Sequence, residues 1–172
     1  MQGIQTTDDD SLCLSAGLEL AVVLIEPRIP QNTGNITRLC ACTGADLYLV
    51  GSLGFRLDDK YLDRAGMDYK AQVNLKHVPD FRNVLEERPG WDVCFLSTKA
   101  KQSYTQKRYA PGTLLVFGPE TSGLPEWVMM DYPESSVRIP MLPGRRSLNL
   151  SSAVSVVVYE AVRQMTSETI SL

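Results

Sequence analysis

Three short segments of the chain combine glycine or proline with polar side chains, and each follows a short apolar run. They are residues 32–38, 117–125 and 138–151, referred to below as the first, second and third segments. Glycine and proline hold unusual backbone geometry, while Asn, Glu, Arg and Ser supply hydrogen-bonding groups. In α/β proteins the loops that bind ligands occupy such positions. We therefore expect the three segments to form one composite site.

The first segment places an amide close to a guanidinium. If Asn32 caps the helix that follows, Asn35 and Arg38 lie three residues apart on one helix face. Such a pair suits an oxyanion, or a ribose hydroxyl together with its phosphate. The alternative, which this segment taken alone favours, is a helix cap followed by a surface arginine.

The second and third segments offer backbone as well as side chains to a ligand. Gly118 and Gly123 let the backbone approach a ligand closely, and Glu120 stands between them at the end of an expected strand. Residues 139–141 offer apolar groups and carbonyls, and residues 147–149 begin the last helix. The alternatives are a turn with a capping acid and a second helix cap.

Several other chemistries are excluded by the sequence. It contains no G-x-x-x-x-G-K-[ST] phosphate loop, no G-x-G-x-x-G after a strand and no G-x-S-x-G elbow. His77 is the only histidine, which argues against a Ser-His-Asp triad and a multi-histidine metal site. Cys40 and Cys42 are separated by one residue, which is neither a redox pair nor a usual zinc spacing. We expect reduced, mostly buried thiols and no bound metal.

Composition indicates one ordinary globular domain. The chain has 172 residues, of which 44% are hydrophobic and 22% charged. No apolar run approaches the roughly 20 residues of a membrane helix. Residues 1–19 include three Asp and no Lys or Arg, unlike a secretory signal or a transit peptide. We expect a cytoplasmic protein with no membrane contact, a flexible leader at 1–19, one domain at 20–165 and a tail at 166–172.

The net charge of −3 argues against a general polyanion binder, but the basic residues are not evenly spread. Residues 99–108 contain four Lys or Arg and no acid. Further arginines lie in or beside the first and third segments: Arg28, Arg38, Arg138, Arg145 and Arg146. Any one of these is most simply a solvated surface charge. Their clustering near the segments keeps a phosphate-bearing substrate plausible.

Apolar runs alternate with helical patterns along the chain. Strands are expected at 20–25, 47–50, 93–96, 114–117 and 136–139, with a weaker candidate at 72–78. Helices are expected at 32–44, 58–65, 79–88 and from 150 to about 165, while 102–112 is expected to be a loop. This alternation predicts an α/β fold with a parallel sheet flanked by helices. Val156 and Tyr159 widen the apolar stripe of the last helix, which indicates a second packing partner.

The three segments, in this order and spacing, resemble the SPOUT class of methyltransferases. The match is to the small tRNA 2′-O-ribose methyltransferases that act on the wobble nucleotide. It extends from residue 26 through 38, over 117–125 and over 138–151, with shorter matches within 54–66 and at 159–161. The resemblance implies a parallel sheet whose C-terminal half forms a deep trefoil knot. General topology rules do not predict such threading.

The resemblance also implies a cofactor, a substrate and an assembly. The cofactor is S-adenosylmethionine, the substrate is the anticodon stem-loop of tRNA, and the enzyme works as a homodimer. The residues implied for cofactor binding are Leu96, Gly118, Ile139, Met141, Ser147 and Leu148. Those assigned to catalysis are Asn35, Arg38, Glu120 and Asn149, and those assigned to RNA binding are Arg28, Arg145, Arg146 and Tyr159.

The expected reaction is methyl transfer to the ribose 2′-hydroxyl of the wobble cytidine or uridine. In the family, the arginine matched by Arg38 is proposed to activate the hydroxyl with help from an RNA phosphate. Because a guanidinium is a poor base, Arg38 has the alternative role of stabilising the alkoxide. Other open alternatives are methylation of another tRNA or ribosomal RNA ribose, and an RNA-binding protein of this fold without activity.

Overall fold

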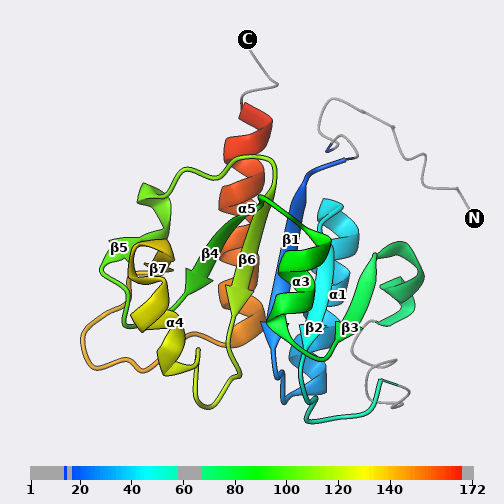
Figure 1. Ribbon diagram of the computed structural model, residues 1–172, viewed down its shortest axis with the longest axis horizontal. Coiled ribbons are helices and arrows are strands. Elements are labelled where there is room, and N and C mark those ends of the chain that lie inside the picture. The colour runs from blue at the N-terminus through cyan, green and yellow to red at the C-terminus, as the bar shows by residue number, and fades with distance from the viewer. Residues whose placement is uncertain (1–13, 15–16, 58–66, 168–172) are drawn as a thin grey trace, which may run out of the picture.

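The apolar runs of the chain form the central strands of one seven-stranded sheet, in which every strand pair is parallel (Figure 1). The computed structural model describes residues 14, 17–57 and 67–167. The strands are β1 (Leu20–Ile25), β2 (Asp46–Val50), β3 (Leu75–Val78), β4 (Asp92–Leu96), β5 (Gln102–Ser103), β6 (Thr113–Phe117) and β7 (Ser136–Arg138). Their order across the sheet is β3-β2-β1-β6-β4-β7-β5. The predicted parallel α/β architecture is confirmed.

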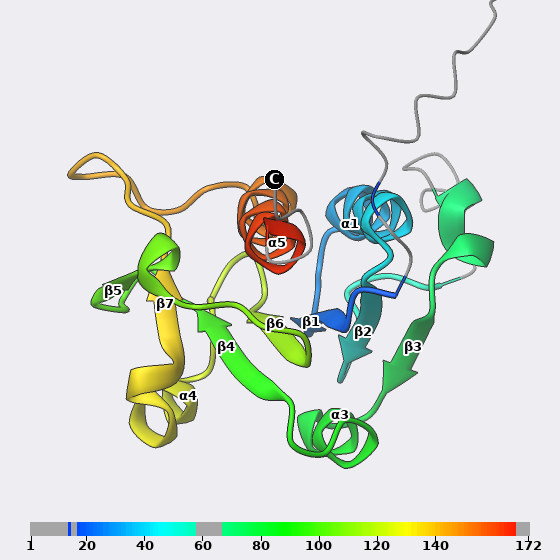
Figure 2. The same cartoon turned by 90° about the horizontal axis from the view of Figure 1, so that it is seen from above.

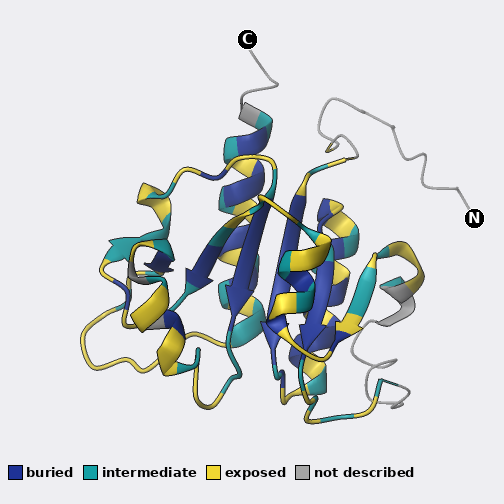
Figure 3. Cartoon of the chain, in the orientation of Figure 1, coloured by how far each residue is buried: buried dark blue, intermediate teal, exposed yellow. Residues whose placement is uncertain are grey.

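Helices cover both faces of this sheet (Figure 2). Helices α1 (Pro30–Thr43) and α5 (Leu150–Ser167) lie on one face, and α3 (Phe81–Glu87) and α4 (Glu126–Asp131) lie on the other. Alternate residues of the strands face the two layers, so that Val22 packs in the α1/α5 core and Val23 in the α3/α4 core. Figure 3 shows that burial is concentrated in the central strands and the inward faces of the helices. Short 3₁₀ turns connect these elements at η2 (Met67–Gln72), η3 (Tyr104–Gln106) and η4 (Pro133–Ser135).

The start of α1 differs from the prediction. Ile29 is the N-cap residue and Pro30 occupies the first turn, so Asn32 lies inside the helix and does not cap it. Proline favours the first helical position because its φ is already helical and it has no N–H to satisfy. The other end is as predicted, because Gly44 closes the helix in a left-handed conformation with φ of 74°.

The remaining helices follow the prediction in part. Helix α3 is capped by Asp80, whose side chain accepts a hydrogen bond from the backbone N–H of Arg82, so it begins two residues later than expected. Helix α5 confirms the expected last helix. The helix expected at 58–65 lies outside the described residues.

Two elements were not predicted from the sequence. Strand β5 lies in a polar segment expected to be a loop, and it pairs with β7 at the edge of the sheet. Helix α4 follows the second segment and packs Val128 into the core. The trefoil knot stays a prediction, and so do the domain boundaries, since most of the leader and tail lies outside the described residues. Among those described, no helix combines the length and apolar character that crossing a membrane requires.

Candidate active site

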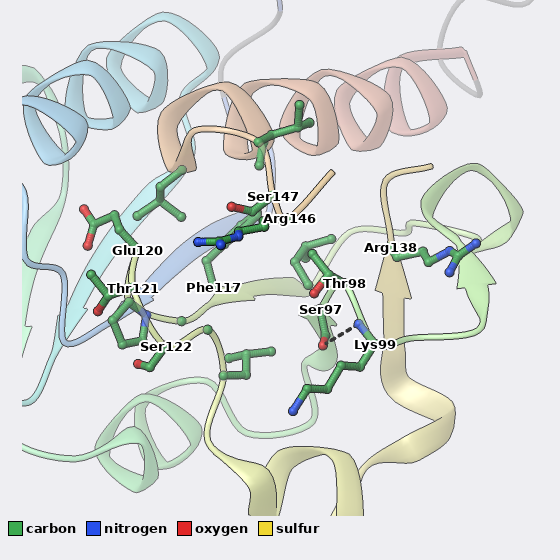
Figure 4. Close-up of a pocket in the computed structure, with 18 of the residues that line it drawn as sticks. Ser97, Thr98, Lys99, Phe117, Glu120, Thr121, Ser122, Arg138, Arg146 and Ser147 are labelled. Carbon is green, nitrogen blue, oxygen red and sulfur yellow. Dashed lines mark hydrogen bonds between the residues drawn. The ribbon is translucent and has the colours of Figure 1, made fainter. Parts of the chain in front are cut away.

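A cavity of about 780 Å³ opens at the carboxyl ends of β4, β6 and β7 (Figure 4). Its walls come from the loop after β4, the second segment after β6, the third segment after β7 and the first turn of α5. Small-molecule sites in proteins have volumes of roughly 300–1,000 Å³. The carboxyl edge of a parallel sheet is also where α/β proteins bind ligands. The cavity is therefore a candidate ligand site, formed largely by the segments singled out from the sequence.

The second segment folds back on itself at the floor of the cavity. A Cβ atom built on Gly118 would lie 2.3 Å from the carbonyl carbon of Gly123, a distance that real Cβ atoms do not reach. Gly123 in turn adopts φ of +68°. Only glycine at position 118 allows the backbone there to approach the backbone of Gly123 so closely. The loop thereby presents its backbone to the cavity.

Glu120 ties the second segment to the start of α1. Its Oε2 accepts a hydrogen bond from the backbone N–H of Arg28 at 2.9 Å, and its Oε1 accepts one from the backbone N–H of Ile29 at 3.1 Å. These donors precede the first turn of α1, where the positive end of the helix dipole also favours a carboxylate. Glu120 therefore holds two parts of the chain together, with both oxygens engaged.

Asn32 connects all three segments. Its side-chain amide donates to Oε1 of Glu120 at 3.0 Å, and its Oδ1 accepts from the side-chain amide of Asn149 at 3.0 Å. Asn149 in turn accepts from the hydroxyl of Ser151 at 2.7 Å and from the backbone N–H of Ser152 at 3.3 Å, which orders the start of α5. Asn32 was expected to cap the helix, and this bridge was not predicted. Pro30 was the available signal, since it places the helix start ahead of Asn32.

The cavity is lined by all six residues implied for cofactor binding: Leu96, Gly118, Ile139, Met141, Ser147 and Leu148. Glu120, Asn149 and Arg146 line it as well. Figure 4 shows Ser97, Thr98 and Lys99 on the loop after β4, across from Glu120 and the loop after β6. Ser97 and Thr98 were not predicted to belong to the site, and Thr121 and Ser122 lie in the second segment but had no role of their own assigned. Their hydroxyl groups add hydrogen-bonding capacity to the loops after β4 and β6.

Asn35 and Arg38 do not belong to this cavity lining. Both are exposed on the outer face of α1, three residues apart as expected. The guanidinium carbon of Arg38 lies 5.1 Å from the ring centroid of Tyr69, a cation–π distance. A single chain thus leaves the assigned catalytic arginine on a surface apart from the cavity.

The residues assigned to RNA binding are all exposed. Arg28 forms an ion pair with Glu26, and Arg145 lies in the loop before α5. Tyr159 is 52% exposed on the outer face of α5. Of this group, Arg146 alone lines the cavity.

The described cysteines differ in how far they are buried. Cys40 and Cys94 are buried, and burial raises the pKa of each thiol to about 12. Cys42 is exposed, and Cys13 lies outside the described residues.

Nε2 of His77 is 2.8 Å from the carbonyl oxygen of Gly51. The described residues contain no group of three or more His, Cys, Asp or Glu side chains arranged to hold a metal.

Comparison with known proteins gives consistent matches over most of the chain. The model of the SpoU rRNA Methylase family matches residues 19–159. A tRNA (cytidine(34)-2′-O)-methyltransferase of Escherichia coli (strain K12) is 48% identical over 147 residues, covering 85% of this chain and 94% of the relative. The enzyme of the same description from Photorhabdus asymbiotica is 47% identical over 152 residues, with the same coverage.

Solved structures show the same similarity in three dimensions. One, solved for structural insights into the 2-OH methylation of C/U34 on tRNA, has a TM-score of 0.81 and 44% identity, covering 86% of this chain and 97% of that one. The SpoU methyltransferase AviRb from Streptomyces viridochromogenes in complex with AdoMet has a TM-score of 0.74 and 25% identity, covering 91% of this chain and 64% of that one.

Proposed function

Because the chain belongs to the SpoU rRNA methylase family, we propose that it transfers a methyl group from S-adenosylmethionine to the 2′-hydroxyl of the wobble cytidine or uridine of tRNA. The observation that carries this proposal is the near full-length match, at 48% identity, to a tRNA (cytidine(34)-2′-O)-methyltransferase. The cavity at the carboxyl edge of the sheet supports it independently. The enzyme is accordingly a methyltransferase that acts on RNA.

The cavity suits S-adenosylmethionine in size and in lining. Leu96, Ile139, Met141 and Leu148 form an apolar wall on which an adenine ring would pack. Gly118 leaves room for the ligand to approach the backbone, where N–H and carbonyl groups can recognise its polar edges. Ser147 and the hydroxyl groups of the loop after β4 would bind the amino-acid end.

The cofactor, when bound, supplies a methyl group already activated by its sulfonium. The protein's own contribution is therefore alignment of the donor with the ribose hydroxyl and help with the proton of that hydroxyl. Glu120 and Asn149 position the loops of the cavity through Asn32. Neither needs to touch the reacting atoms for this role.

Arg38 is the residue we assign to the ribose oxygen. Since a guanidinium does not give up its proton in proteins, it favours the developing alkoxide by charge and hydrogen bonding. Removal of the proton then falls to another acceptor, such as an RNA phosphate. Asn35, one turn before Arg38 on the same exposed face, orients the ribose or the phosphate.

A homodimer explains how the outer face of α1 becomes part of a closed site. Val156 and Tyr159 are 38% and 52% exposed on α5, beside α1 on the same face of the sheet (Figure 2). Pairing with a second copy would cover this apolar surface. Arg28, Arg145, Arg146 and Tyr159 would then contact the anticodon stem-loop. We place this reaction in the cytoplasm.

The first experiment is transfer of radiolabelled methyl groups from S-adenosylmethionine to bulk tRNA that lacks its native modifications. Label in a 2′-O-methylated pyrimidine nucleoside, mapped to the wobble position, is the expected result. Label that appears only when ribosomal RNA replaces tRNA as the acceptor would exchange the proposed substrate for the one in the family's description. Absence of cofactor binding by calorimetry would overturn the methyltransferase proposal as a whole.

A further inference from the structure

Positive charge in this acidic protein is concentrated in two stretches of the chain. Residues 97–117 and 136–149 contain seven Lys or Arg and no Asp or Glu. The rest of the chain contains ten Lys or Arg and all 20 Asp or Glu, a net charge of −10. A separation of this size produces a local field whose sign is opposite to that of the whole molecule.

The fold brings the loop after β4, from the first stretch, and the third segment, from the second stretch, to one end of the sheet. Leu96 of β4 and Gln102 of β5 both lie level with Val137 of β7, because β7 runs between the two strands. The loop that carries Lys99 and Lys101 therefore leaves the sheet and re-enters it close to Arg138, the last residue of β7. Neighbouring strands are about 4.8 Å apart, so these three backbones are close together.

Five of the seven basic residues form what we call the basic rim. All five are exposed, and they lie on the loop after β4 and on the third segment: Lys99, Lys101, Arg138, Arg145 and Arg146. Lys99, Arg138 and Arg146 also line the cavity (Figure 4). Lys107 is excluded because its ammonium pairs with Asp92 at 2.7 Å, and Arg108 because it precedes β6, whose opposite end opens into the cavity.

Acidic side chains near the cavity do little to offset this charge. Glu120 and Glu126 are the carboxylates among the described lining residues. These two carboxylates stand against the five basic residues of the rim, three of which line the cavity with them. The mouth of the cavity on the β5–β7 side is therefore positively charged, which favours a polyanion over a neutral ligand.

We propose that the basic rim binds phosphates of the RNA strand that flanks the target nucleotide. The RNA would then reach the cavity across the β5–β7 edge of the sheet. Lys99, Lys101 and Arg138 become RNA-binding residues in addition to Arg145 and Arg146. This inference rests on the proposed function for the identity of the RNA, but the charge pattern and the fold carry the location.

The test compares two double variants that remove the same charge from different places. Lys101→Gln/Arg145→Gln changes the rim at two exposed positions outside the cavity lining, while Lys76→Gln/Arg82→Gln removes one Lys and one Arg from β3 and α3, where Arg82 is exposed and Lys76 is half-buried and pairs with Glu87. The Kd for unmodified tRNA is measured by fluorescence anisotropy between 50 and 300 mM salt, and the Kd for S-adenosylmethionine by calorimetry. Folding is checked by circular dichroism.

The rim variant is expected to bind tRNA roughly tenfold more weakly, with the slope of log K against log salt reduced by about 1.5, or 0.7–0.9 for each lost phosphate contact. Its affinity for S-adenosylmethionine stays within twofold of wild type. The control variant keeps the wild-type slope.

Equal slopes for the two variants would overturn the proposal, and so would a rim variant that loses cofactor affinity instead of tRNA affinity. If the wild-type protein binds tRNA through the rim but methylates none, the proposed function fails while the rim inference stands.

Discussion

The cavity at the ends of β4, β6 and β7 differs from the outer face of α1 in how completely one chain assembles it. The cavity contains all six residues implied for cofactor binding, and hydrogen bonds through Asn32 join its loops. The outer face of α1, which we call the α1 surface, is formed by the exposed residues Gln31, Asn35, Arg38 and Cys42. It lies open, with Arg38 over the ring of Tyr69.

This difference separates two tasks that one site must perform. On the proposed mechanism, cofactor binding needs only groups that a single chain already holds in place. Turnover would need Arg38 to meet the ribose, and RNA or a second copy of the chain would close the α1 surface onto a cavity. Substitutions in the two regions should therefore have effects of different kinds.

Replacing Arg38 by Ala should have the largest effect on catalysis. We expect kcat to fall by at least 100-fold, because the charge that favours the alkoxide is lost. The Kd for S-adenosylmethionine should stay within about twofold, since Arg38 does not line the cavity. Single-turnover methyl transfer and calorimetry measure the two quantities.

Arg38→Lys is the matched control, because it keeps the charge and loses the planar fork of the guanidinium. Turnover of Arg38→Ala at the wild-type rate would remove Arg38 from the mechanism. A large loss of cofactor affinity would instead show that the two regions are not separate.

Replacing Gly118 by Ala should produce the opposite pattern. The new Cβ would lie 2.3 Å from the backbone of Gly123, so the loop must move. We expect cofactor affinity to fall roughly tenfold or more, in line with the cost of overpacking. Pro125→Ala, at the end of the same segment and outside the cavity lining, should bind the cofactor normally. Unchanged calorimetric affinity in Gly118→Ala would mean that the cofactor does not rest on this loop.

Replacing Asn32 by Ala should affect both regions moderately. It leaves hydrogen-bonding groups of Glu120 and Asn149 without their shared partner, which costs about 1–3 kcal/mol for such part-buried groups. Unfolding in urea should show this loss, and both cofactor affinity and turnover should fall. Gln31→Ala, at the exposed neighbouring position, is the control. A variant with wild-type stability would show that the three segments are held by other contacts.

The sequence predicted the layers of this fold better than the location of the site residues. Buried strands such as β1 and β6 carry continuous apolar runs, and α5 carries a clear helical stripe. Strand β5 has two polar residues and is recognisable only from its pairing with β7. Asn32 was misplaced because its side chain suits a cap equally well, and only its distant partners reveal the bridge.

The position of Arg38 illustrates a limit of a different kind. Its spacing from Asn35 correctly predicted a shared helix face. Spacing within a helix, however, carries no information about which face of the domain the helix covers. The tertiary packing of α1 beside α5 decides that Arg38 lies outside the cavity.

Alkylation of Cys42 should give the smallest effect and report on the α1 surface alone. Cys42 is exposed one turn beyond Arg38, whereas burial raises the pKa of Cys40 and Cys94 to about 12. At pH 8 the buried thiols are protonated and shielded from solvent, so iodoacetamide should modify Cys42 first in a Cys13→Ser background. Mass spectrometry gives the site, and methyl-transfer assays should show slower turnover with unchanged cofactor affinity.

A Cys42→Ser variant separates crowding of Arg38 from loss of the thiol, because it should keep full turnover and resist the reagent. Protection of Cys42 that rises with protein concentration would indicate that a second copy covers the α1 surface. Modified protein that loses cofactor affinity would contradict the separation, since α1 would then be coupled to the cavity through more than Asn32. Modified protein with wild-type turnover would show that the RNA and any second copy do not contact α1 at Cys42. The catalytic contact would then be limited to the turn of α1 that carries Asn35 and Arg38.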